Sequence, residues 1–268
     1  MTIMKLRLGV RGMMWLTLVI MMWGIISCRT QEEKCLEEVL SLPLANKEEL
    51  QKVLDHYKDD SLKYQAVCFL IRNMPFHAGY EGNALKHYYQ YFDIYAQGKL
   101  GPHEVIDSLK ENSFSVSQLK RIEDIANIDS SLLVQNVDWA FKVWREQPWG
   151  KNVSFDNFCE FVLPYRLGDE PLGFWREDIY KRYNPILDSI RLLPQAQDPL
   201  VAAKVLMDSL VVEQSHFTGL FPAGPHLGPS VVSWRAGSCR EFADLVVYVM
   251  RALGIPCGTD YMAVSYTH

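Results

Sequence analysis

The sequence predicts a mainly α-helical N-terminal domain, residues 28–214, followed by a shorter C-terminal domain, residues 215–268. Through the first of these, apolar residues recur three and four positions apart, the spacing of helices that bury one face. Few stretches alternate with a period of two, so we expect very little sheet there. The run SHFTGLFPAGPHLGPS at 215–230 holds three Gly and three Pro, and it sets the boundary because no helix can pass through it.

Residues 1–27 predict a signal peptide. Three basic residues among the first eleven precede an uncharged apolar run at 13–26, and Ser27 and Cys28 follow. A basic start, an apolar stretch of about 7–15 residues and a small residue before the cut are typical of a secretory signal. The apolar run is also shorter than the roughly 20 residues that a membrane-spanning helix needs.

The tetrapeptide IISC at 25–28 resembles the bacterial lipobox, in which the Cys thiol is acylated and becomes the first residue of the mature protein. The resemblance implies lipid attachment at Cys28. It therefore implies an exported protein that is lipid-anchored to the cell envelope, at the periplasmic face or the cell surface. An ordinary signal peptide and a membrane anchor that contains a Cys are the alternatives.

Capping residues predict the first helices of the N-terminal domain. Asn46, with Glu49 three residues later, predicts a capping box before the apolar stripe that starts at Leu50. Asp60 or Ser61 predicts the start of the next helix. Further helices are expected around Tyr88 up to Gly98, and at 103–110, 116–126, 132–144, 178–192 and 199–212.

Aromatic residues crowd the segment 149–175, around Pro164, Gly168 and Pro171. Aromatic side chains at irregular spacing usually fill gaps in a core. We therefore expect an ordered loop that holds two helices together, with a ligand surface as the alternative.

The most informative stretch is a helix predicted from about Cys239 to Leu253. Ser238 is a good N-cap residue, and Gly254 marks the helix end. Cys239 thus lies in the first turn, where unpaired N–H groups and the positive end of the helix dipole stabilise a thiolate, the nucleophilic form of cysteine. A small buried cysteine at the start of an ordinary helix is the alternative. The apolar residues of the helix share one face: Phe242, Leu245, Val246, Val249 and Leu253.

The segments GSC (237–239), FADL (242–245) and MRALGIP (250–256) together resemble the transglutaminase-like superfamily, whose nucleophile segment reads Gly-x-Cys, a helix, and then Leu-Arg-Ala-x-Gly-Ile-Pro. The resemblance covers residues 234–261. It implies that residues 215–268 form the start of an α+β papain-like transglutaminase fold, with Cys239 as the catalytic nucleophile.

By this resemblance, the full-length protein would attack carboxamide or peptide carbonyls through a Cys239 thioester. The outcome would be amide hydrolysis, deamidation or acyl transfer to an amine, and we rank hydrolysis first because water is its only acceptor. The substrate would be a protein, a peptide or a peptidoglycan-like polymer. A non-catalytic surface lipoprotein that binds peptide or glycan through a degenerate transglutaminase-like module is the alternative.

Members of this family use Cys, His and Asp in that chain order, on the helix and on two strands that follow it. Residues 257–266 are expected to form the first strand, whereas the Asp-bearing strand is missing and His268 lies early for the family His. We therefore assign no catalytic role to His268 and expect the chain to be an inactive fragment, truncated at its C-terminal end. Without later strands to cover the Cys239 helix, residues after 215 are expected to be loosely ordered.

The remaining histidines and cysteines carry no assigned chemistry. His216 and His226 precede Cys239, the wrong order for this family, and the other four are scattered, so each is expected on the surface or in a loop. An oxidising compartment would permit disulfides, with three pairings open. The four cysteines concerned are Cys35, Cys68, Cys159 and Cys257, of which Cys68 and Cys159 are expected to be buried thiols.

No phosphate loop, zinc-ligand spacing or Ser-centred elbow occurs in the sequence, so we expect no cofactor and no metal. The net charge of -5 and the absence of a basic cluster predict no nucleic-acid partner.

Overall fold

The computed structural model describes residues 31–111, 115–212, 216–217 and 224–260. The predicted signal peptide, Cys28 and His268 lie outside these ranges. Within them, no helix combines the length and the apolar character needed to cross a membrane. The chain divides into two compact units, Met1–Leu42 and Pro43–His268. The first contains helix α2 (Gln31–Leu40), and every other element belongs to the second.

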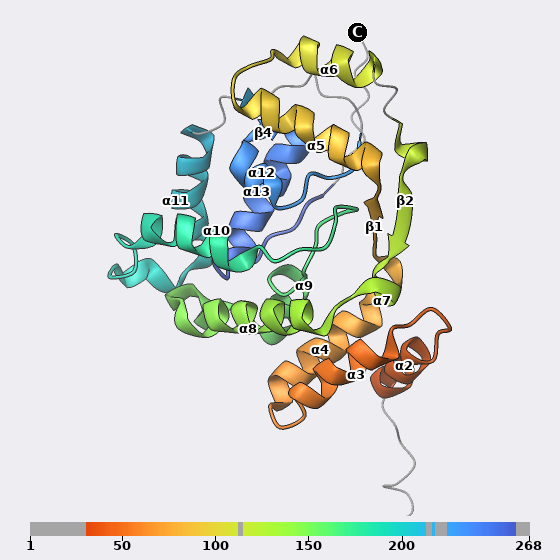
Figure 1. Ribbon diagram of the computed structural model, residues 1–268. Coiled ribbons are helices and arrows are strands. Elements are labelled where there is room, and N and C mark those ends of the chain that lie inside the picture. Colours follow the sequence, from red (N-terminus) through yellow and green to blue (C-terminus); the bar gives the residue numbers. More distant parts are fainter. Residues whose placement is uncertain (1–30, 112–114, 213–215, 218–223, 261–268) are drawn as a thin grey trace, which may run out of the picture. The chain divides into compact units, whose positions relative to one another are not determined.

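The second unit is mainly helical, which confirms the predicted helical character (Figure 1). Short 3-10 turns connect several of its helices, as at Met74–Phe76 and Pro148–Asn152. The helices are α3 (Lys47–His56), α4 (Ser61–Asn73), α5 (Asn83–Ala96), α6 (Pro102–Glu111), α7 (Asp124–Asn127), α8 (Ser130–Glu146), α9 (Phe155–Phe161), α10 (Arg176–Tyr183), α11 (Pro199–Val212), α12 (Ser230–Trp234) and α13 (Cys239–Ala252).

Sheet is confined, among the described residues, to two short pairs of strands. β1 (Ala78–Glu81) runs antiparallel to β2 (Lys120–Glu123). β3 (His216–Phe217) pairs in parallel with β4 (Ala236–Gly237), which leads directly into α13. The expectation of very little sheet in the helical part is confirmed.

The helix predicted at 116–126 was wrong. A 3-10 turn (Val116–Gln118), β2 and the short α7 occupy this stretch. Its apolar residues lie three apart, which suits a helix, but β2 pairs with β1 so that Ile122 lies opposite Gly79. The neighbouring strand decides the conformation here, because strand preference depends on the tertiary surroundings more than helix preference does.

Helix starts were predicted better than their caps. α3 begins after Asn46 as expected, but the Asn46 side chain makes no capping hydrogen bond. The Glu49 carboxylate instead accepts the N–H of Ser130 (2.8 Å) at the start of α8, so the predicted capping box was wrong. At α4, Asp60 caps as expected by accepting the N–H of Lys63 (3.1 Å).

The helix predicted at 178–192 is shorter than expected. α10 ends at Tyr183, and a 3-10 turn (Asn184–Leu187) follows. Pro185 explains this end, because it has no N–H to donate to the carbonyl four residues before it. The prediction at 199–212 agrees with α11.

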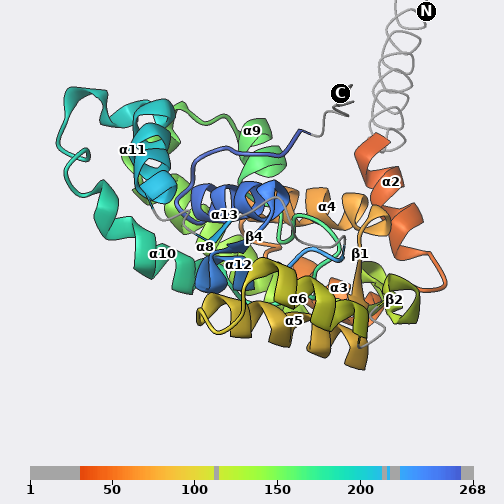
Figure 2. The same cartoon turned by 90° about the horizontal axis from the view of Figure 1, so that it is seen from above.

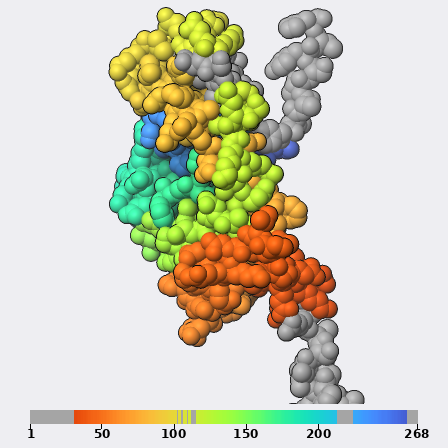
Figure 3. All heavy atoms as spheres, turned by 45° about the vertical axis from the view of Figure 1, so that its right-hand side comes forward, coloured from red at the N-terminus to blue at the C-terminus, as the bar shows by residue number. Residues whose placement is uncertain are grey.

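α13 lies in the middle of the second unit, packed against α8, α10, α11 and α12 (Figures 1 and 2). Leu245 and Val249 are completely buried, in one core with Trp149 of the 3-10 turn after α8 and Leu206 of α11. In the space-filling view, only small areas of the blue C-terminal segment are visible, because earlier parts of the chain lie in front of the rest of it (Figure 3).

The described residues after 215 pack into the same core as the preceding helices. Burying an apolar side chain such as Leu245 contributes roughly 1.5–3 kcal/mol, and the cover comes from helices that precede residue 215. By its contacts, the chain on both sides of the predicted boundary at 214–215 belongs to one compact unit, Pro43–His268. Of the predicted apolar face, Phe242 and Val246 stay partly exposed.

Candidate active site around Cys239

The first turn of α13 explains the order Gly-Ser-Cys. Ser238 is the N-cap, and its hydroxyl accepts the N–H of Arg240 (3.3 Å). The Glu241 carboxylate reaches back and accepts the Ser238 N–H (2.8 Å), which completes a capping box. Gly237 has a φ of 139°, and a Cβ there would collide with the Glu241 side chain, so glycine fits both the backbone and the space.

The segment Gly254-Ile255-Pro256 follows the end of α13, and the helix end explains the glycine. The Ile255 N–H donates to Met250 O (2.9 Å) and the Gly254 N–H to Arg251 O (3.2 Å), the paired bonds of a Schellman motif. Gly254 has a φ of 75°, and a Cβ there would lie 3.1 Å from the carbonyl oxygen of Val143 in α8. The predicted start and end of this helix are both confirmed, within one residue.

Cys239 is exposed and opens onto a cavity of about 530 Å³ alongside α13. The α13 wall of the cavity is apolar apart from its start, and the opposite wall is the chain that follows the helix. The residues lining it are Cys239, Arg240, Phe242, Ala243, Val246, Val247, Cys257, Gly258, Thr259 and Asp260. Residues 257–260, the described part of the strand predicted at 257–266, have no regular secondary structure.

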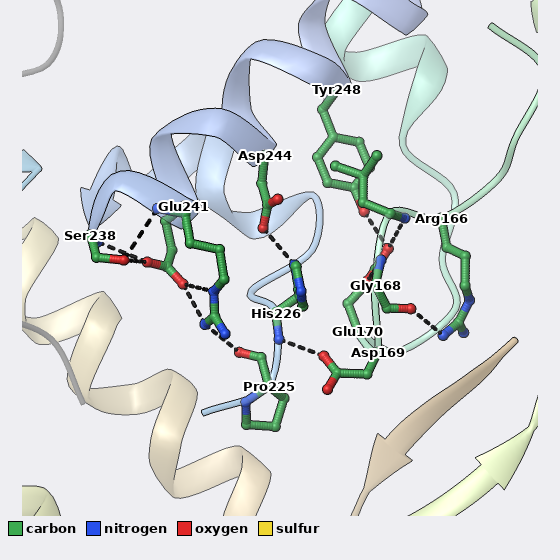
Figure 4. A network of polar contacts seen from close by, with 12 residues as sticks. Arg166, Gly168, Asp169, Glu170, Pro225, His226, Ser238, Glu241, Asp244 and Tyr248 are labelled. Carbon is green, nitrogen blue, oxygen red and sulfur yellow. Dashed lines mark hydrogen bonds and ion pairs between the residues drawn. The ribbon is translucent and has the colours of Figure 1, made fainter. Parts of the chain in front are cut away.

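The side of α13 turned away from the cavity carries a polar stripe. Glu241, Asp244 and Tyr248 follow each other at helical spacing and point to one side (Figure 4). Asp244 Oδ2 lies 2.8 Å from His226 Nδ1, and the Tyr248 hydroxyl donates to Glu170 Oε1 (2.6 Å). The stripe thus ties α13 to two loops, one holding Glu170 and one holding His226.

His226 links these two loops to each other. Its backbone N–H donates to Asp169 Oδ1 (2.7 Å) while its ring contacts Asp244 (Figure 4). Burial lowers the pKa of His226, but the hydrogen bond and charge of Asp244 outweigh it and leave the pKa above its ordinary value. His226 therefore contacts two acidic side chains, Asp169 through its backbone and Asp244 through its ring, and the raised pKa favours the protonated ring.

Glu170 holds its own loop together by hydrogen bonds to backbone N–H groups. Its carboxylate also accepts the N–H groups of Leu167 (2.7 Å) and Gly168 (2.8 Å). Burial raises the pKa of Glu170, but Tyr248 and these N–H donors outweigh it, so the pKa lies below its ordinary value. The buried Arg166 beside it pairs with Asp124 (2.8 Å), and the Arg166 carbonyl accepts from Arg251 Nη1 of α13 (3.1 Å).

The aromatic segment 149–175 is an ordered loop only in its second part, because the end of a 3-10 turn (Pro148–Asn152) and α9 occupy its first part. The Trp175 indole donates to Tyr165 O (2.9 Å). The fully buried guanidinium of Arg176 donates to the carbonyls of Val162 (2.6 Å) and Leu163 (3.0 Å), and to Arg251 O (3.1 Å) in α13. The loop at 162–175 therefore joins α9 and α10 to α13.

The structure does not bring a histidine to Cys239 within the described residues. His226, which we expected in a loop and assigned no role, contacts the opposite side of α13. The backbone of His216 pairs with Ala236 just before α13, while its side chain lies outside the described part. Sequence reasoning missed the His226–Asp244 pair, because their 18-residue separation follows no local motif.

The cysteines other than Cys239 differ in burial. Cys159 is 3 % exposed, which confirms the prediction of a buried thiol, whereas Cys68 is only half-buried. No disulfide joins any two of the five cysteines in the described ranges. In the same ranges, no group of three His, Cys, Asp or Glu side chains converges on a point where a metal ion would fit.

Comparisons with known proteins add no relative: no family model, no curated protein and no solved structure matches the chain.

Proposed function

We propose that this chain carries the nucleophile of a transglutaminase-like thiol enzyme, and that residues 215–268 begin an α+β papain-like fold. The observation that carries the proposal is an exposed Cys239 at the first residue of a fully capped helix, opening onto a cavity. A helix start favours the thiolate, and the thiolate is the reactive form of cysteine. The agreement of 234–261 with the family's nucleophile segment supports the same reading.

The proposed reaction begins with attack of the Cys239 sulfur on a carboxamide or peptide carbonyl. A C–S bond forms, the C–N bond breaks, and the nitrogen leaves as ammonia or an amine after gaining a proton. Water then cleaves the thioester to give the carboxylate and regenerate the thiol, and an amine in place of water would give acyl transfer. The substrate is a protein, a peptide or a peptidoglycan-like polymer.

One backbone donor is suited to the oxyanion formed on attack. The N–H groups of Arg240 and Glu241 are taken by the Ser238 side chain, and that of Phe242 by Ser238 O. The Cys239 N–H has no acceptor among the residues that the structure describes. It belongs to the proposed nucleophile residue, and a backbone N–H aimed at the developing oxyanion stabilises it.

The proposal places the protein at the cell envelope. The signal peptide would direct export, and lipid attachment at Cys28 would anchor the chain to a membrane through its N-terminus, with the helical part and Cys239 outside the cytoplasm. Peptide and peptidoglycan-like polymers are the amide substrates of that compartment.

The test is acyl transfer to hydroxylamine by protein expressed from the intact gene. A glutamine-rich peptide and purified peptidoglycan peptides are supplied in turn, and the hydroxamate product is measured. Wild type and Cys257→Ser should both form product, because Cys257 lines the cavity without being the nucleophile. Cys239→Ser should form none. Product from Cys239→Ser, or none from wild type with either substrate, would overturn the proposal.

A further inference from the structure

We propose that Arg240 and Glu241 are positioning residues for Cys239, which hold the first turn of α13 against the loop at 224–225. This inference rests on the proposed function of Cys239 as a nucleophile. It concerns side chains for which the resemblance to known enzymes assigns no role.

A continuous set of hydrogen bonds joins the two segments. Glu241 Oε2 accepts from the N–H (2.8 Å) and hydroxyl (2.5 Å) of Ser238, directly before Cys239. Glu241 Oε1 accepts from Arg240 Nε (2.7 Å) and Nη2 (2.5 Å), a two-pronged contact of guanidinium and carboxylate. Arg240 then donates to Gly224 O (2.7 Å) and Pro225 O (3.2 Å).

Both ends of this set are fixed. A Cβ at Gly224 would lie 2.6 Å from the Tyr88 ring of α5, so the loop is wedged between Arg240 and a buried aromatic side chain. At the other end, the Glu241 side chain packs directly over Gly237. The orientation of the Cys239 thiol relative to the core is therefore set through Arg240 and Glu241 as well as through the helix itself.

The charges of the two side chains also act on Cys239. Glu241 is 2 % exposed, and although burial raises its pKa, hydrogen bonds from Ser238 and the charge of Arg240 outweigh this, so its pKa lies below the ordinary value. The Glu241 carboxylate lies in the same helical turn as Cys239. The guanidinium of Arg240 pairs with that carboxylate and lines the same cavity as the thiol.

The test measures the rate at which iodoacetamide alkylates Cys239 in the full chain, as a function of pH. Arg240→Gln removes the charge and should move the midpoint of the profile to higher pH, which slows alkylation about tenfold near neutral pH for each unit of movement. Arg240→Lys keeps the charge and should restore the midpoint while leaving a lower rate. The double variant Arg240→Gln/Glu241→Gln should return the midpoint towards wild type, because neither charge remains.

Arg182→Gln is the matched control. Arg182 also donates to a loop carbonyl, Val232 O (3.1 Å), but it has no described contact with the first turn of α13. If Arg240 has only a structural role, Arg240→Gln will lower the melting temperature without moving the midpoint of the alkylation profile, or Arg182→Gln will move that midpoint equally. Either result would overturn the inference. If wild-type Cys239 is no more reactive than the other cysteines, the proposed function fails instead. If Arg240→Gln does not fold, Arg240→Lys and Glu241→Gln decide by the same readout.

Discussion

Trp149 donates its indole N–H to the carbonyl oxygen of Leu253, 2.9 Å away, and so joins a buried aromatic ring to the last turn of the helix that begins at Cys239. Trp149 follows α8 in the helical part, and Leu253 lies after the Gly/Pro-rich segment. The C-terminal end of α13 is therefore held by a residue from the part of the chain that precedes the predicted boundary at 214–215.

This contact predicts the stability of a Trp149→Phe variant. The substitution keeps most of the ring but leaves the Leu253 carbonyl without its donor, which costs about 1–3 kcal/mol when the acceptor is buried. The free energy of unfolding in urea measures the change. Trp139→Phe, at a half-buried ring on α8, is the control and should cost less. Equal losses for the two variants would show that the contact contributes nothing specific.

A second prediction concerns Gly237. Gly237→Ala should destabilise the fold by more than about 1 kcal/mol, because a left-handed φ disfavours alanine and its Cβ would displace Glu241. Alkylation of Cys239 should slow in the same variant. Gly173→Ala is the matched control, since a Cβ at Gly173 meets no atom within 4 Å. Unfolding curves and alkylation rates that are the same for both variants would contradict this account of the Gly-Ser-Cys order.

The His226–Asp244 pair predicts how stability depends on pH. Because the pKa of His226 is raised above its ordinary value of 6.5, its protonated form stabilises the folded state. That contribution is complete below pH 6.5 and is lost as the pH rises through the higher pKa of the folded protein. The charged groups that act on His226 are Asp244, Arg240 and Glu170, with Asp244 dominant.

The measurement is the difference in unfolding free energy between wild type and His226→Gln, followed upward from below pH 6.5. The difference should shrink as the pH rises. His87→Gln, at an exposed position on α5, should show no such trend. A difference that grows with pH would mean that His226 is neutral in the folded protein.

Lipidation is tested separately. Metabolic labelling with a palmitate analogue should mark the wild-type protein, and Cys28→Ala should abolish the label while Cys35→Ala keeps it. A soluble, unlabelled wild-type protein would contradict the lipoprotein prediction.

The sequence was most informative where local rules act alone. The start of α13 at Ser238 and its end at Gly254 follow from capping and from the backbone freedom of glycine, and both were predicted. The contact between Glu241 and Ser238 also follows a local rule, because Ser-x-x-Glu is the capping-box pattern.

Contacts between segments that are far apart in the chain could not be predicted from the sequence. β1 and β2 lie about forty positions apart in the chain, and the pairing of Ile122 with Gly79 overrides a spacing that suits a helix. The burial of Arg176 and Glu170 could not be predicted from the sequence either, because charged residues are rarely buried. Their hydrogen-bond partners are largely backbone groups of one loop, which no sequence pattern indicates. The same limit explains why the cover of α13 by earlier helices was not foreseen.

The central claim, that Cys239 is an activated nucleophile, is tested most directly by its alkylation rate at mildly acidic pH in the folded and the guanidinium-unfolded chain. Burial raises the pKa of Cys159 to about 12 and also raises that of Cys257, so both should react more slowly in the folded state than in the unfolded state. Cys239 should react faster in the folded state, because only there does a helix start favour its thiolate. A folded-state rate for Cys239 at or below its unfolded-state rate, or earlier alkylation of Cys257, would contradict the claim.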